Sequence, residues 1–206
     1  MNNYDYQFTS QGNHDECYTP PYVVEAIVPY LPCGKTIWCP FDKDYSPFVQ
    51  VLQKHGFDVV RSHIDDGKDF YKYEPKHWDI IVSNPPFTGK KDIFKRALSF
   101  GKPFALLMTV TWLNDAAPVD VFNRRDLQLY MFRDRVKYIN PDGSEIGNVV
   151  NFKSAFFCKG LLPQQIIMEP STKANQYIPN FDITYTPWGT TKINLDWDPW
   201  CLDSSF

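Results

Sequence analysis

The sequence predicts an α/β protein built on a mostly parallel sheet, and three observations lead to this prediction. Residues 80–82 are β-branched and run into Asn84-Pro85-Pro86-Phe87, as a buried parallel strand followed by a rigid loop would. Residues 35–39 and 57–60 flank an apolar helical pattern that ends at Gly56, which indicates a βαβ unit. Residues 104–110 are continuously apolar and predict a further buried strand.

Composition limits the class of protein. A chain of 206 residues with 43% hydrophobic and 17% aromatic content can form one domain with a full core. The formal net charge of −3 argues against a uniformly basic nucleic-acid binder but permits a local basic patch. We expect no membrane segment, because no apolar run is long enough. Five scattered cysteines show no zinc spacing, so we expect reduced thiols, no metal and a cytoplasmic location.

The remaining elements follow from local patterns. Thr19 is predicted to cap a helix that carries prolines in its first turn and ends near residues 29–32. Helices are also predicted after residue 48, around 93–98 and over 120–129, and strands over 135–139 and 154–158. Residues 161–206 are rich in proline and tryptophan. We interpret them as a hairpin and tail packed on the same domain, which itself spans residues 1–160.

The loop after residues 80–82 suits one kind of ligand. Asn84 offers an amide oxygen, and Pro85 lacks an N–H but keeps its carbonyl oxygen, so two acceptors lie side by side. Phe87 adds a flat aromatic face. Two acceptors beside such a face suit an amine on a flat heterocycle, which describes adenine. The alternative is an ordinary strand followed by a proline turn.

Two motifs carry a resemblance to a known family. Asn84-Pro85-Pro86-Phe87 resembles the Asp/Asn/Ser-Pro-Pro-aromatic signature of amino-methyltransferases. Residues 39–42 (Cys-Pro-Phe-Asp) and 46–48 (Ser-Pro-Phe) are similar to the cofactor loop of EcoRI-type adenine-specific DNA methyltransferases. The resemblance implies a three-layer Rossmann-like methyltransferase fold, whose seven-stranded, mostly parallel sheet closes with an antiparallel hairpin.

The resemblance also implies site residues. The loop Asn84, Pro85, Pro86 and Phe87 would be catalytic. Residues Tyr18, Thr19, Pro20, Cys39, Pro40, Asp42, Ser46, Phe48, Asp69, Phe70 and Asn84 would bind S-adenosylmethionine. Within that set, residues 18–20 and Asp42 would lie near the amino-acid portion of the cofactor, and residues 69–70 near its adenine.

A basic cluster follows the loop and has two interpretations. Lys90, Lys91, Lys95 and Arg96 lie on the helix predicted there. Such charge is usually a solvated helix face, but beside a target pocket it also suits contacts to backbone phosphates.

The predicted function is methylation of the adenine N6 amino group in DNA, with the target base flipped out of the helix. RNA adenine methylation, glutamine methylation of a protein and an inactive methyltransferase-like binding protein are the alternatives. The last is favoured by the absence of glycine from residues 40–46 and of an acidic residue at 61–63. EcoRI-type enzymes are longer, and the missing length is where their target-recognition elements are expected, so the sequence leaves open whether a partner subunit supplies target recognition.

Overall fold

The computed structural model describes residues 19–122, 126–138 and 152–169. Its seven strands form one sheet in the order β2-β1-β3-β4-β6-β5-β7. Among them β6 runs antiparallel to its two neighbours, and the other pairings are parallel. The predicted fold class is therefore confirmed. The strands are β1 (Thr36–Cys39), β2 (Asp58–Arg61), β3 (Ile80–Ser83), β4 (Phe104–Thr109), β5 (Gln128–Met131), β6 (Ser154–Lys159) and β7 (Ile166–Met168).

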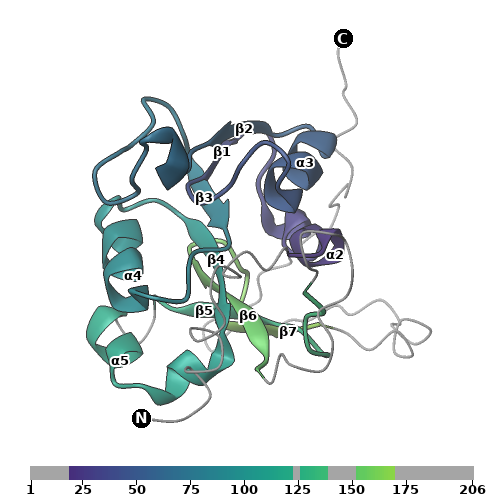
Figure 1. The fold of residues 1–206 in the computed structure, drawn as a ribbon. Helices are drawn as coiled ribbons and strands as arrows, with labels where there is room; N and C mark the ends of the chain where they lie inside the picture. Colours follow the sequence, from purple (N-terminus) through teal and green to yellow (C-terminus); the bar gives the residue numbers. More distant parts are fainter. Residues whose placement is uncertain (1–18, 123–125, 139–151, 170–206) are drawn as a thin grey trace, which may run out of the picture.

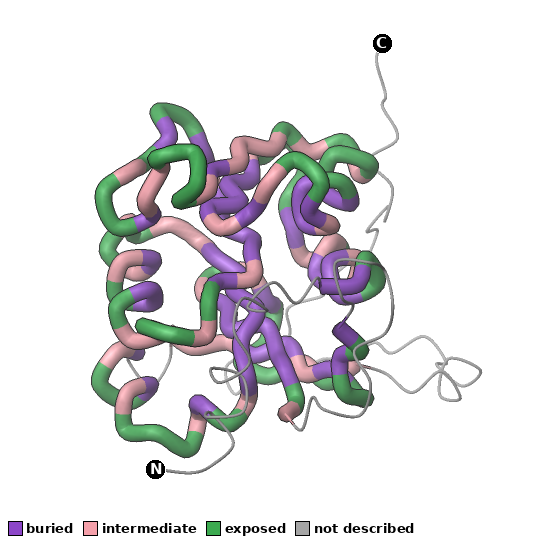
Figure 2. The backbone as a smooth tube through the Cα atoms, in the orientation of Figure 1, coloured by how far each residue is buried: buried purple, intermediate pink, exposed green. Residues whose placement is uncertain are grey.

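Helices cover both faces of the sheet and complete the three layers (Figure 1). Helices α2 (Pro21–Glu25) and α3 (Pro47–Lys54) lie on one face, and α4 (Lys90–Ser99) and α5 (Ala117–Val121) lie on the other. Three short 3₁₀ segments, η1 (Val28–Tyr30), η2 (Ile64–Asp66) and η3 (Val110–Asn114), follow α2, β2 and β4. Figure 2 shows that the central strands are buried, while the outer turns of the helices are exposed.

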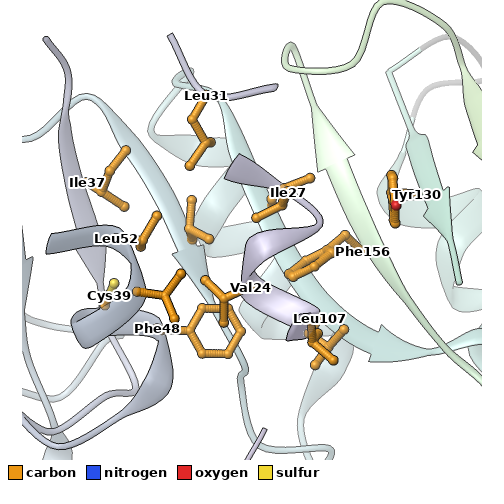
Figure 3. Packing of buried hydrophobic residues seen from close by; sticks show 14 of the residues in the cluster. Val24, Ile27, Leu31, Ile37, Cys39, Phe48, Leu52, Leu107, Tyr130 and Phe156 are labelled. Atoms are coloured by element: carbon orange, nitrogen blue, oxygen red, sulfur yellow. The ribbon is translucent and has the colours of Figure 1, made fainter. Parts of the chain in front are cut away.

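Successive side chains along the central strands point alternately into two cores, one on each face of the sheet. Ile80 and Val82 of β3 face α2 and α3, whereas Ile81 between them faces α4. Figure 3 shows the first core, where Phe48 of α3 meets Val24 of α2 above the sheet. Because both faces of β3 and β4 are buried, the two strands are apolar at nearly every position.

Local sequence explains α3 but not the start of α2. The Ser46 hydroxyl accepts a hydrogen bond from the Phe48 N–H at 3.2 Å, and Gly56, at φ 80°, follows the C-terminus. The prediction that Thr19 caps α2 is wrong. Pro20 holds the cap position without a side-chain cap bond, and Thr19 instead bonds to a residue of the loop after β3.

The predicted helix over residues 120–129 is wrong. Helix α5 ends at Val121, and residues 128–131 form β5, which pairs with β6 on one side and β7 on the other. Leu129 faces the α4 core and Tyr130 faces the α2–α3 core. This alternation is the period of a strand, and the antiparallel pairing with β6 stabilises it.

The predicted strand over residues 135–139 is also wrong for its described part, 135–138. Val136 and Tyr138 are buried and alternate with exposed Arg135 and Lys137, as in a strand. However, the Lys137 N–H donates to the Tyr22 hydroxyl at 3.0 Å and not to a neighbouring strand. The antiparallel closing pair therefore consists of β5 and β6.

The two edges of the sheet follow from the strand order. The segment before β3, residues 68–73, forms turns and contains no strand, so β2 is the edge of the sheet on that side. The seventh strand is β7, which extends the other edge in parallel to β5. Of residues 161–206, which are predicted to form a hairpin and tail, 170–206 lie outside the described residues. Cys39 and Cys158 are free thiols, but Cys33 is disulfide-bonded, so the prediction of reduced thiols is wrong for Cys33.

The topology places several loops at one edge. The carboxyl ends of β1, β3 and β4 meet there because these strands are parallel. β6 starts at the same edge, since Ser154 pairs with Thr109 at the end of β4. We call this the carboxyl edge.

Candidate active site

Asn84 lies at the carboxyl edge, directly after β3. Its side-chain Nδ2 donates a hydrogen bond to Thr19 Oγ1 at 3.2 Å, which joins the loop after β3 to the residue two positions before α2. Thr19 is 4% exposed. The contact bridges 65 positions in the sequence, so the fold holds the Asn84 amide from outside its own loop.

The other end of the same amide has no partner. Asn84 Oδ1 is buried and accepts no hydrogen bond within the described part of the chain. A buried acceptor without a donor costs about 1–3 kcal/mol, so native proteins rarely leave one unless a ligand supplies the donor. Asn84 Oδ1 is therefore a candidate contact for an N–H group.

The rest of the loop forms a firm apolar wall. Pro85 is buried and Pro86 is exposed, so the loop turns outward after Asn84. Phe87 is half-buried and meets Phe152 edge to face, with ring centroids 5.5 Å apart. Phe152 reaches the carboxyl edge because it lies two residues before β6. The Phe87 ring thus packs against Phe152 while it remains partly open.

Asp42 lies below this loop as a buried junction between β1, α3 and β3. One carboxylate oxygen accepts from the Ser46 hydroxyl at the start of α3, and the other accepts from the Ser83 hydroxyl. Ser83 directly precedes Asn84, so Asp42 anchors the base of the loop. The Asp42 N–H also donates to the Ser62 carbonyl at 3.2 Å, which fixes its backbone against the end of β2.

Burial sets the ionisation of Asp42. Desolvation raises the pKa of Asp42 from 3.8 to about 6, although the hydrogen bonds from Ser46 and Ser83 lower it. Near neutral pH the carboxylate is mostly charged, and its two oxygens are both occupied by serine hydroxyls. Burial, followed by the charge of Asp42, raises the pKa of the neighbouring Cys39 thiol well above its ordinary value, so Cys39 is not a nucleophile.

Several predicted cofactor-binding residues are covered by protein. Cys39 and Phe48 are at most 1% exposed in the α2–α3 core, and Pro40 is also buried. Phe70 is 3% exposed and packs against Phe41 and Trp38, with centroids at 4.8 and 5.5 Å. The side chains of these residues shape the site from beneath.

Asp69 is more accessible. Its Oδ1 accepts from the Tyr71 N–H at 3.0 Å, and its side chain is 29% exposed. Tyr71 then reaches toward the loop that follows β3: its hydroxyl lies 3.3 Å from where a Cβ would stand on Gly89. Partial burial and the charges of Asp92 and Asp69 raise the pKa of Tyr71. Gly89 has φ 71° and starts α4, so this approach requires glycine there.

The four basic residues of α4 have different surroundings. Lys91 forms an ion pair with Asp120 at 2.8 Å and thereby lowers the pKa of that carboxyl group. The Arg96 guanidinium lies over the Phe100 ring at 4.3 Å. Lys95 is exposed and Lys90, at the start of α4, is half-buried. Lys90 and Lys95 therefore fit phosphate contacts better than their two neighbours.

The fold brings the predicted residues together only in part. Hydrogen bonds join Thr19 to Asn84 and Asp42 to Ser46 and Ser83, and Ser83 directly precedes Asn84 in the chain. Sequence reasoning missed Ser83 and the link from Thr19 to Asn84. The available signal for Ser83 was a serine at the end of a buried strand. The link from Thr19 to Asn84 has no local signal in the sequence. Tyr18 lies outside the described residues.

Comparisons with known proteins identify no family for the chain. No family model matches the chain, and no curated protein matches its sequence. Among solved structures, a predicted O-methyltransferase, protein Atu636 from Agrobacterium tumefaciens, aligns over 69% of this chain and 83% of its own, with a TM-score of 0.41 and 12% identity. Likeness at this level is distant. In the described segments, no helix is long and apolar enough to cross a membrane, and no three His, Cys, Asp or Glu side chains cluster as a metal site.

Proposed function

We propose that the protein transfers a methyl group from S-adenosylmethionine to the N6 amino group of an adenine flipped out of DNA. The observation that carries this proposal is the buried, unpartnered Oδ1 of Asn84 at the carboxyl edge. An exocyclic amine would supply the missing donor. The sequence Asn-Pro-Pro-Phe, in which the next carbonyl belongs to a proline and an aromatic ring follows, supports the choice of a flat amine-bearing heterocycle.

On the side of the methyl acceptor, the residues would hold and orient the target base. Asn84 Oδ1 and the Pro85 carbonyl oxygen would each accept one hydrogen of the amine, which draws the nitrogen lone pair out of conjugation with the ring. Phe87 would stack on the base, with Phe152 supporting the ring from its edge. Positioning of this kind accounts for most of the rate enhancement when two bound groups react directly.

The residues present fit the methyl donor in part. Asp69 offers a carboxylate that is 29% exposed and can accept from an adenine amino group. The next residue, Phe70, packs against the half-buried ring of Phe41. Thr19 and Pro20 lie on the other side of Asn84, toward α2. Asp42 would act indirectly, by holding the loop after β3, since its two carboxylate oxygens accept from the hydroxyls of Ser46 and Ser83. S-adenosylmethionine supplies an electrophilic methyl group on a sulfonium.

Transfer of a labelled methyl group tests the proposal. The full chain would be incubated with labelled S-adenosylmethionine and, separately, unmethylated double-stranded DNA, single-stranded RNA and a protein extract, followed by nucleoside and amino-acid analysis. We expect label in N6-methyladenine from DNA. Label found only in RNA or in glutamine would overturn the choice of substrate, and absence of transfer from all three would overturn the activity. We also propose that a partner subunit recognises the target sequence. Without that subunit, methyl transfer to mixed DNA of random sequence should be weak and unselective.

Phe87 should contribute mainly to capture of the base. Phe87→Ala removes the stacking face, and stacking of a base on an aromatic side chain contributes about 1–3 kcal/mol. We expect KM for DNA to rise about 5- to 100-fold, while Phe87→Trp stays close to the parent. Steady-state kinetics with an adenine-containing duplex measure both variants. An unchanged KM for Phe87→Ala would remove Phe87 from the base site.

Lys90 and Lys95 should supply the phosphate contacts of α4. Replacing both by glutamine is expected to weaken DNA binding equally for all sequences and to lower the slope of log K against log salt by about 1 for each lost contact. Lys54→Gln, at an exposed position on the last turn of α3, is the matched control and should leave the slope unchanged. Equal slopes for parent and double variant would assign both lysines to a solvated helix face.

A further inference from the structure

We infer that Thr19 is a positioning residue for Asn84: it binds the amide nitrogen and thereby holds the amide where its oxygen is left for the acceptor amine. The inference rests on the proposed function. A side-chain amide has a donor end and an acceptor end of almost the same shape. Only the oxygen end can accept from an amine; the nitrogen end would set one donor against another.

The contact that holds the amide in place comes from Thr19, whose hydroxyl accepts from the amide nitrogen. Its Oγ1 lies 3.2 Å from Asn84 Nδ2, and among the described residues this is the hydrogen bond recorded for the amide. With the nitrogen engaged in this way, Oδ1 is the end left without a partner. The same contact in reverse would bury an unpaired N–H, and that group would repel the amine.

The position of Thr19 is itself firmly held. Pro20 restricts the backbone next to it, and the Pro20 carbonyl accepts from the Val23 N–H at 3.1 Å to begin α2. Val23 and Val24 are fully buried against the sheet. Since α2 is anchored in the core and Thr19 is itself buried, the backbone at Thr19 is held beside Asn84. The structure thus gives Thr19 a role distinct from the cofactor contact predicted from its sequence.

A comparison of Thr19→Val and Thr19→Ser tests this role. Valine keeps the shape but removes the hydroxyl, and serine keeps the hydroxyl. We expect kcat of Thr19→Val to fall about tenfold, the effect of losing a hydrogen bond to a buried group, and Thr19→Ser to restore most of it. Affinity for S-adenosylhomocysteine, measured by calorimetry, should change less than about threefold.

Two further measurements make the outcome decisive. Binding of an adenine-containing duplex in the presence of S-adenosylhomocysteine should weaken in Thr19→Val without any turnover. Thr109→Val is the matched control: Thr109 is buried at the same edge and bonds within η3, so its loss should leave both DNA affinity and kcat unchanged. Thermal melting checks that both variants fold. If Thr19→Val weakens only S-adenosylhomocysteine binding, or if it keeps full kcat and DNA affinity, the positioning role is overturned while methyl transfer stands. A parent chain without any transfer overturns both proposals.

Discussion

Asn84→Ala should lower kcat by about 10²- to 10³-fold, the effect seen when one preorganised polar contact to a reacting group is removed. The buried Oδ1 is the atom that meets the amine in the proposed mechanism, and alanine has no acceptor to replace it. Affinity for S-adenosylhomocysteine should stay within about threefold, because an interaction made in the transition state contributes to kcat more than to ligand binding. Single-turnover kinetics and calorimetry measure the two quantities.

The same substitution should leave the fold almost unaffected. It removes one hydrogen bond to Thr19 but also removes a buried acceptor without a partner, and these effects on stability oppose each other. Asn114→Ala, at an exposed position at the end of η3, is the matched control and should keep full activity. Full-speed methyl transfer by Asn84→Ala would show that the loop after β3 is not catalytic.

Asp42 should make the free energy of unfolding fall by about 3 kcal/mol as the pH rises from about 4 to 6. Its pKa is 3.8 as an ordinary side chain and about 6 in the folded protein, and two pKa units correspond to about 3 kcal/mol. Between these values the folded state keeps a proton that the unfolded state has lost, so stability decreases with rising pH. Below pH 4 and above pH 6 this contribution is constant.

Asp42→Asn isolates the effect from the other titrating groups. An amide can accept from one serine hydroxyl and donate to the other, so it imitates the protonated acid without titrating. Urea unfolding of both proteins at pH 4 and pH 7 should give similar stabilities at the lower pH and a more stable Asp42→Asn at the higher pH. A difference between the two proteins that does not vary with pH would mean that Asp42 ionises with an ordinary pKa.

The elements that could be predicted from sequence are those whose signal is local. Residues 80–82 and 104–109 are apolar on both faces, which predicts buried parallel strands, and Ser46 with Pro47 marks the start of α3. The loop Asn84 to Phe87 could be singled out as a candidate amine site because the groups that suggest it lie in four consecutive residues.

Tertiary structure decided whatever depends on a distant partner. Residues 128–131 became β5 because β6 and β7 pair with them on both sides. Residues 135–138 alternate equally well but pair with none of the described strands, and the Lys137 N–H donates to Tyr22. The link of Thr19 to Asn84 spans 65 positions, and that of Asp42 to Ser83 spans 41. Sequence alone determined which loop is the candidate for the proposed chemistry, because composition and spacing are local. The orientation of the Asn84 amide and the pKa of Asp42 arise only from the packing of α2, β1 and β3, because hydrogen bonding and desolvation depend on neighbours that the fold brings together.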